Sequence, residues 1–371
     1  MTAHPAARPR ARDLGIVLGV LPPGPHNAIT DVEGVRVGHT TLWRGDGPLV
    51  RGVGPVRTGV TAILPHGDNL FLEKVPAAAA VFNGFGKTTG LVQVDELGEL
   101  ETPILLTNTL SVGQVSDALV GWMVEQHPAI GVTTSSVNPV VAECNDGYLN
   151  DLGGRHVGEA DVRAAIAEAR GGPVAEGNLG GGTGMVCYGW AGGIGTASRR
   201  LAADRGGWTV GALVLANFGR PQDLLIAGVP VGRELAKLAA QEREHGSIIV
   251  VIATDAPVDA RQLGRIARRG PLGLALTGSH GGHGSGDVVI AFSTANRIPH
   301  YATALVRQAT LVDEHGPAID GLFAATVEAT EEAVINALCA ARTIVGRDDH
   351  RREALPTAEV VEILRQRGAM E

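Results

Sequence analysis

The stretch Gly246-Ser-Ile-Ile-Val-Val-Ile-Ala-Thr-Asp255 decides the fold, because its run of β-branched residues begins directly after a Gly-Ser pair. Such a run predicts a buried strand, since it is too short and too branched for a helix. A charged segment, 231–245, precedes it and is predicted to be helical as far as Glu244. The chain therefore enters a rigid central strand at Ser247.

The Gly-Ser pair also suggests a chemical role. Gly246 has no Cβ, so the peptide bond before Ser247 has access to geometries closed to other residues. If that bond breaks, Ser247 becomes the first residue of a new chain, and its α-amine, with a usual pKa of about 7.7–8.0, can act as the base for its own hydroxyl. That is the logic of an N-terminal nucleophile hydrolase. The alternative is a turn followed by a core strand, and this decapeptide alone favours the alternative.

Composition limits the remaining possibilities. The 371 residues are 44% hydrophobic, enough for one large domain or two smaller ones, and the net charge of −8 argues against nucleic acid as a partner. No apolar run reaches the roughly 18 residues needed to span a bilayer. Three widely spaced cysteines fit a reducing cytoplasm better than a disulfide framework. Residues 1–10 are predicted to be a disordered tail, because Pro, Arg and Ala alternate there without pattern.

The chain contains two Gly-rich stretches, 176–198 and 278–287. The first, 176–198, lacks both the G-x-G-x-x-G and the G-x-x-x-x-G-K-[ST] spacing, so a close-packed backbone crossing or a pocket floor is a better prediction than a phosphate loop. The second, 278–287, precedes a predicted strand, 288–293. It contains His280 and His283, but a pair without a third ligand at metal spacing does not predict a metal site.

Several polar residues stand at the ends of predicted strands, where a scaffold holds side chains in fixed geometry. Asn217 follows the strand 208–216, and its amide is a candidate oxyanion donor. Ser285 and Asp287 are candidates for holding the Ser247 amine and hydroxyl in line. Three ordinary loops with capping residues are the alternative.

Further strands are predicted nearer the N-terminus. Residues 27–42 are predicted to form two short strands broken at Glu33-Gly34. Residues 131–142 are predicted to form a strand that runs into Glu143, for which a solvated carboxylate is the simplest interpretation. Strands and helices come in blocks as well as in alternation, which favours layered sheets flanked by helices.

At these residues the sequence resembles the L-aminopeptidase D-amidase/D-esterase (DmpA) family, which includes the β-peptidyl aminopeptidases. The resemblance runs from residues 11–15 to the C-terminal helix, and so many long matches in one order outweigh the simple-turn interpretation of Gly246-Ser247. The matching stretches are Asn27–Val35, Gly59–Pro65, Glu143–Asp151, Glu176–Asn178, Gly180–Met185, Ile226–Gly232, the Gly246-Ser247 strand, Ser285-Gly286-Asp287 and Ile290–Asn296.

The resemblance implies a four-layer αββα sandwich of a self-processing N-terminal nucleophile hydrolase. Residues 11–371 would then form one domain, cut before Ser247 into fragments 11–246 and 247–371 that stay together and assemble into a homo-oligomer, expected to be a tetramer of processed protomers. No metal or organic cofactor is implied.

The resemblance also assigns roles. Ser247 matches the nucleophile, and Asn217 matches the amide at the oxyanion site. Ser285 and Asp287 match the pair that supports the nucleophile. Some relatives carry Glu at the position of Asp287. Two further residues match substrate-binding positions: Glu143 matches the acid that binds the free amine, and Tyr148 matches an active-site tyrosine.

The function expected from these matches is a serine aminopeptidase or amidase that removes the N-terminal residue from small peptides, amides or esters. An amidase acting on non-peptide oligoamides and a processed but inactive small-molecule binding protein are the alternatives. A burst of product from an aminoacyl p-nitroanilide separates an enzyme from a binding protein.

Overall fold

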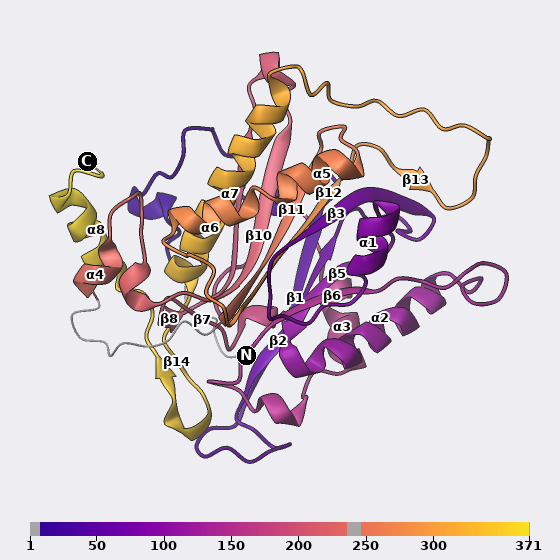
Figure 1. The fold of residues 1–371 in the computed structure, drawn as a ribbon. Helices are drawn as coiled ribbons and strands as arrows, with labels where there is room; N and C mark the ends of the chain where they lie inside the picture. Colours follow the sequence, from indigo (N-terminus) through magenta and orange to yellow (C-terminus); the bar gives the residue numbers. More distant parts are fainter. Residues whose placement is uncertain (1–7, 236–245, 371) are drawn as a thin grey trace.

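Two β-sheets stack face to face between two layers of helices (Figure 1). The computed structural model describes residues 8–235 and 246–370. The smaller sheet has the strand order β1-β2-β5-β6, with bounds Arg36–Arg44, Val56–Leu64, Ile104–Asn108 and Val140–Cys144. Helices α2 (Val112–Gln126) and α3 (Glu159–Ala167) cover its outer face.

The larger sheet has the order β13-β3-β12-β11-β10-β9, with β4 paired to β3 at one edge. The bounds along this order are Ile298–Pro299, Glu73–Gly84, Ser285–Ser293, Gly246–Thr254, Thr209–Asn217 and Gly193–Arg200, and β4 is Glu99–Leu100. Its outer face is covered mainly by α5 (Ala260–Ala267), α6 (Gly270–Leu276) and α7 (Ala318–Ala340). The layers thus run helix, sheet, sheet, helix.

Short elements complete the described chain. Helix α1 (Leu91–Leu97) packs beside β3, and α4 (Val231–Leu235) contacts α8 (Thr357–Gln366). Two small hairpins pair β7 with β8 and β14 with β15. Their bounds are Val186–Cys187, Trp190–Ala191, Ile344–Val345 and Arg351–Arg352.

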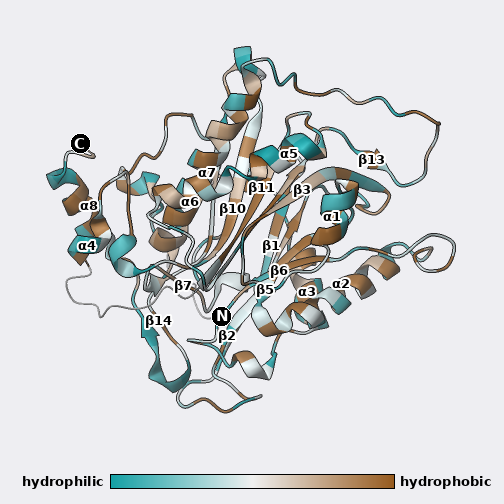
Figure 2. Cartoon of the chain, in the orientation of Figure 1, coloured by the Kyte–Doolittle hydropathy of each residue, from teal (hydrophilic) through white to brown (hydrophobic). Residues whose placement is uncertain are grey.

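Strand β11 lies at the centre because both of its faces are apolar. Ile248, Val250 and Ile252 face the core beneath α7, whereas Ile249 and Val251 face the core between the sheets. Burying one such side chain stabilises the fold by about 1.5–3 kcal/mol relative to exposure. Figure 2 shows the same arrangement, with hydrophobic strands in the middle, mixed colour on α8 and hydrophilic colour on the hairpin labelled β14.

Two predicted strands differ from the structure. Residues 29–31 form a 3-10 helix, because the Asp31 carboxylate accepts the backbone N–H groups of His26 and Ala28 and closes a turn. In the stretch 131–142 the strand begins only at Val140, since the preceding Pro139 has no N–H to give to a ladder. The predicted helix 231–244 is observed for 231–235, and its remainder lies outside the described residues.

The N-terminal boundary also differs from the prediction. Arg8 and Arg10 lie within the predicted disordered tail, yet Arg8 donates to the Leu355 carbonyl oxygen at 2.8 Å and Arg10 forms an ion pair with Glu176 at 2.6 Å. Residues 8–10 therefore belong to the folded part of the chain, and residues 1–7 lie outside the description.

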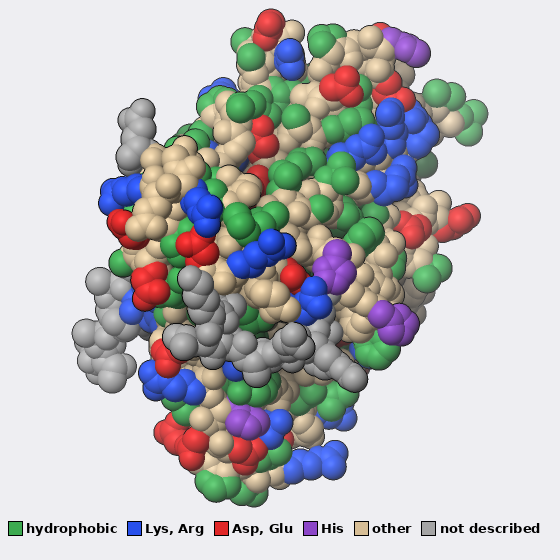
Figure 3. Space-filling model, turned by 60° about the vertical axis from the view of Figure 1, so that its left-hand side comes forward, with side chains coloured by type: hydrophobic (Ala, Val, Ile, Leu, Met, Phe, Trp, Pro, Cys, Tyr) green, Lys and Arg blue, Asp and Glu red, His purple; other side chains and the backbone are tan. Residues whose placement is uncertain are grey.

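The surface is mixed in character. On the face shown in Figure 3, acidic, basic and hydrophobic side chains lie beside one another. Within residues 8–235 and 246–370, no helix has the length and apolar content needed to cross a membrane.

The Gly-rich stretch 176–198 is a close-packed backbone crossing, as the sequence predicts. A Cβ placed on Gly195 of β9 would lie 2.0 Å from the Ala333 carbonyl oxygen and 2.6 Å from the Ala337 nitrogen, both in α7. Glycine at this position therefore lets the longest helix lie directly on the sheet.

We predict that Gly195→Ala destabilises the protein by about 1–3 kcal/mol, because the extra methyl group must push α7 away from β9. The matched control is Gly121→Ala in α2, where an added Cβ meets nothing within 4 Å. That change should stabilise the protein slightly, by up to about 1 kcal/mol, since alanine favours helix. Denaturant unfolding of the two variants measures both effects, and equal stabilities would contradict the packing argument.

Candidate active site

Three neighbouring strands of the larger sheet, β10, β11 and β12, bring polar residues together at one end of the sheet, where β10 ends and where β11 and β12 begin. Because β10 and β11 are antiparallel, the last residue of β10, Asn217, pairs with Ser247 near the start of β11. Because β11 and β12 are parallel, Ser247 also pairs with Gly286, whose N–H donates to the Ser247 hydroxyl oxygen at 3.1 Å. Strand pairing thus fixes both neighbours of the Ser247 side chain.

Gly246 has the backbone that the Gly-Ser argument requires. Its φ is 155°, and a Cβ there would lie 2.0 Å from the Asn217 carbonyl oxygen. Any other residue would have to displace the end of β10.

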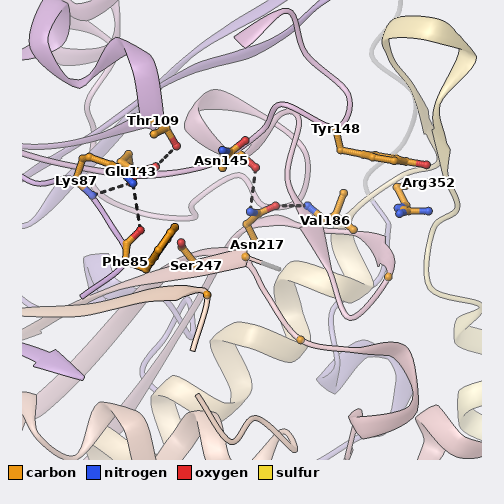
Figure 4. A pocket seen from close by; sticks show the side chains of 14 residues that line it. Phe85, Lys87, Thr109, Glu143, Asn145, Tyr148, Val186, Asn217, Ser247 and Arg352 are labelled. Carbon is orange, nitrogen blue, oxygen red and sulfur yellow. Dashed lines mark hydrogen bonds between the residues drawn. The ribbon is translucent and has the colours of Figure 1, made fainter. Parts of the chain in front are cut away.

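A cavity of about 560 Å³ opens at this edge, between the ends of the two sheets (Figure 4). It is lined by Phe85, Lys87, Thr109, Glu143, Asn145, Tyr148, Val186, Gly189, Asn217, Gly219, Gly246, Ser247, Gly284 and Arg352. Of the predicted site residues, Glu143, Tyr148, Asn217, Gly246 and Ser247 all line this cavity.

The Glu143 side chain is a buried carboxylate rather than a solvated one. It is 2% exposed and stands near the end of β6. One oxygen accepts the Lys87 backbone N–H at 2.8 Å, and the other accepts the Thr109 hydroxyl. Burial raises the pKa of Glu143 above its usual range, and the two hydrogen bonds oppose that rise because they favour the charged form. The site therefore holds a desolvated acid facing the cavity.

The Asn217 side chain is locked by its neighbours. Its amide oxygen accepts the Val186 N–H at 2.8 Å, and its amide nitrogen donates to the Asn145 carbonyl oxygen at 3.0 Å. An amide nitrogen carries two hydrogens, so one donor remains beyond the Asn145 bond. The orientation of this donor is set by three segments of the chain that are distant in sequence.

Tyr148 forms a partly exposed wall of the cavity. Its ring stacks on His350 with centroids 4.5 Å apart, and the Arg352 guanidinium carbon lies 4.1 Å from the ring centroid. Both partners belong to the β14–β15 hairpin. His350 is 202 residues from Tyr148 in the sequence.

Ser285 and Asp287 lie within β12 itself, not in the loop before it, and their side chains hydrogen-bond to each other. They flank Gly286, so they project to the face of the sheet opposite the Ser247 side chain. Neither lines the cavity. Ser285 nevertheless pairs with Gly246, which puts this buried pair beside the peptide bond that precedes Ser247.

Neither loop histidine, His280 or His283, is among the residues that line this cavity. His280 Nδ1 lies 4.0 Å from an Asp223 oxygen. Among the described residues, no group of three His, Cys, Asp or Glu side chains is arranged to hold a metal ion.

The sequence did not single out Thr109 and Arg352, which also line the cavity. Thr109 lies directly after β5, which runs parallel to β6, so its proximity to Glu143 follows from strand pairing. No spacing rule connects Arg352 to Tyr148, because their contact arises only from the fold.

Comparison with known proteins identifies the chain. Residues 27–352 match the family model described as Peptidase family S58. The chain belongs to peptidase family S58. The beta-peptidyl aminopeptidase BapA of Sphingosinicella microcystinivorans is 44% identical over 98% of this chain and 94% of that protein.

Two solved structures are similar to this chain over almost its whole length. A Pyrococcus horikoshii OT3 protein is 53% identical, with a TM-score of 0.93 over 97% of this chain and 99% of that one. The L-aminopeptidase D-Ala-esterase/amidase of Ochrobactrum anthropi, described as a prototype for the serine aminopeptidases and a variant of the Ntn hydrolase fold, is 43% identical. Its TM-score is 0.90, over 98% of this chain and all of that one.

These findings confirm the predicted family and the αββα architecture of an N-terminal nucleophile hydrolase. They also confirm the expected class of activity: this S58 chain is a hydrolase of the aminopeptidase type.

We predict that Thr109→Val raises the pKa of Glu143 further, because valine keeps the shape of threonine but removes a donor to the charged carboxylate. NMR titration of isotope-labelled glutamate carboxyl groups measures the shift. Thr107→Val is the control, since the Thr107 hydroxyl donates to the Gly59 carbonyl oxygen instead. A Glu143 pKa that is the same in the native protein and in Thr109→Val would contradict the assigned hydrogen bond.

Proposed function

We propose that this chain hydrolyses the N-terminal residue from small peptides, amides or esters, with Ser247 as an N-terminal nucleophile. The observation that carries the proposal is that the Ser247 hydroxyl, the Asn217 amide and the buried Glu143 carboxylate line one cavity. The family and the two named relatives, a β-peptidyl aminopeptidase and an L-aminopeptidase D-Ala-esterase/amidase, support the same activity.

The first step is cleavage of the chain itself. The Ser247 hydroxyl attacks the Gly246 carbonyl carbon, and the peptide nitrogen leaves as the Ser247 amine, which gives an ester. Water then hydrolyses the ester and releases the Gly246 carboxylate and the hydroxyl. The φ of 155° at Gly246 supports this step, because it holds the peptide bond before Ser247 in a conformation that residues with a Cβ avoid.

The same hydroxyl then attacks the scissile carbonyl of a substrate, and the Ser247 α-amine takes its proton. The free amide hydrogen of Asn217, together with the Tyr148 hydroxyl, stabilises the oxyanion. The leaving group departs with the proton from the α-ammonium, and water resolves the acyl-enzyme. Ser285 and Asp287 hold the α-amine from the other side of the sheet, which their position beside Gly246 supports.

Glu143 binds the free amine of the substrate. A buried carboxylate held by two fixed donors is a strong partner for an ammonium group, because a hydrogen bond between two charged groups is roughly twice as strong as one between neutral groups. This requirement for a free amine is what distinguishes an aminopeptidase from an endopeptidase.

The two processed fragments would stay associated, because both contribute strands to the larger sheet. Strands β11 and β12, both after the cut, lie between β10 and β3, which come before it. A cytoplasmic location is supported by Cys144, Cys187 and Cys339, which are buried free thiols. Assembly into a homo-oligomer, a tetramer of processed protomers, is part of the proposal.

We predict that the purified protein consists of fragments ending at Gly246 and beginning at Ser247, and that Ser247→Ala remains a single inactive chain. Intact mass and N-terminal sequencing under denaturing conditions measure processing, and turnover of a panel of aminoacyl p-nitroanilides measures activity. The panel includes L-α, D-α and β residues, since the relatives span these classes. Full activity in an uncut chain would rule out the N-terminal nucleophile mechanism.

We predict that Glu143→Gln raises KM for free-amine substrates by roughly 10- to 100-fold, the loss expected when a charge-assisted contact worth about 1.5–3 kcal/mol is removed. The isosteric amide keeps the shape of the site, so processing at Gly246 should continue. Steady-state kinetics of native and variant enzyme give KM and kcat separately. Equal cleavage of N-acetylated and free-amine substrates by the native enzyme would remove this role from Glu143.

A further inference from the structure

The cavity has charged side chains at both of its ends. Glu143 lies at one end and Arg352 at the other, with Ser247 and Asn217 between them in the view of Figure 4. Lys87 also lines the cavity, on the side of Glu143, where its ammonium donates to the Phe85 carbonyl oxygen at 3.3 Å. In that view the buried Glu143 carboxylate, with Lys87 beside it, lies on one side of the nucleophile, and the Arg352 guanidinium lies on the other.

The fold holds Arg352 firmly at this end. It belongs to β15, which pairs with β14 through Val345 and Arg351. The hairpin between these strands is fastened to the turn that carries Tyr148, because His350 Nδ1 hydrogen-bonds to the Tyr148 carbonyl oxygen at 2.7 Å. The Tyr148 ring then contacts the Arg352 guanidinium. Stacking on an aromatic ring limits the positions that this guanidinium can take.

A neighbouring arginine, Arg347, lines a different cavity. Arg347 donates to the Gly147 carbonyl oxygen at 2.7 Å and forms an ion pair with Asp348. It fastens the hairpin to the turn, and it lines an adjoining cavity rather than the one that contains Ser247. Arg352 is therefore the arginine that faces a ligand held at Ser247.

We propose that Arg352 binds the C-terminal carboxylate of the peptide portion that leaves, so that the enzyme selects short peptides with a free C-terminus. This inference rests on the proposed function, in which Glu143 takes the amine and Ser247 attacks the first carbonyl. A free dipeptide or tripeptide carries an ammonium at one end and a carboxylate at the other, matching the charges along the cavity. A guanidinium offers a planar fork of donors suited to a carboxylate.

The test compares matched substrates that differ only in the last group. Dipeptides and tripeptides begin with the residue best accepted as a p-nitroanilide and end in glycine, either as the free acid or as the carboxamide. The native processed enzyme should favour the acid in kcat/KM by about tenfold for at least one length, mainly through KM. The preference should shrink as salt is added, because screening weakens a partly exposed ion pair.

Variants then test whether Arg352 causes the preference for the free acid over the carboxamide. Arg352→Gln should bring the ratio of acid to amide near one, because it slows cleavage of the free acid much more than cleavage of the carboxamide. Arg352→Lys should retain part of the ratio, because lysine keeps a point charge. Arg351→Gln is the matched control, since exposed Arg351 in the same strand pairs with Glu353, outside the cavity. It should keep the native ratio.

The outcomes separate the two proposals. A native ratio near one for both lengths, or equal slowing of acid and amide in Arg352→Gln, overturns the role of Arg352 while leaving the aminopeptidase activity established. Failure of the native enzyme to turn over any free-amine substrate overturns the proposed function, and the role of Arg352 with it. The native ratio and its salt dependence require no variant, so the test does not depend on how well Arg352→Gln folds.

Discussion

The pairing of β11 with both of its neighbours is the constraint on which the site depends. Antiparallel pairing on one side sets Asn217 opposite Ser247, and parallel pairing on the other sets Gly286 there. A shift of one residue in either register would turn the Ser247 side chain from the space between the sheets to the helix-covered face. Each face of β11 packs against its own core, so such a shift would have to repack both cores at once.

The smaller sheet supplies the acidic side chain that lines the cavity. Strand β6 brings Glu143 to the same edge, and the Cys144 thiol donates to the Ser247 carbonyl oxygen at 3.2 Å, which ties the two sheets together beside the nucleophile. The same packing removes water from Glu143 and raises its pKa. Burial and hydrogen bonding therefore act in opposition on this carboxylate, and its charge state depends on the balance between them.

The N-terminal segment and the β14–β15 hairpin, both distant from β11 in sequence, also contribute to the fold and to the site. Arg199 forms ion pairs with Glu328 and Glu332 of α7, and Arg12 from the N-terminal segment pairs with Glu332 as well. Removing one partner from such a buried group would leave an uncompensated charge, which is more costly than losing the whole group. At the other end, the β14–β15 hairpin closes one side of the cavity. Segments far from the central strand in sequence are thus needed to complete the site.

The sequence by itself determined the central strand, the strand end at Asn217 and the helix 357–366. Through the resemblance it also indicated the family and five of the residues that line the cavity, which are Glu143, Tyr148, Asn217, Gly246 and Ser247. These features follow from local patterns: β-branched runs, turn residues and motifs in fixed order. Only the tertiary structure decided that Ser285 and Asp287 lie on the far face of the sheet, that Thr109 bonds to Glu143 and that Arg352 stands beside Tyr148. The physical reason is that side-chain partners, desolvation and cavity shape depend on which distant segments pack together, whereas a strand is specified by its own residues.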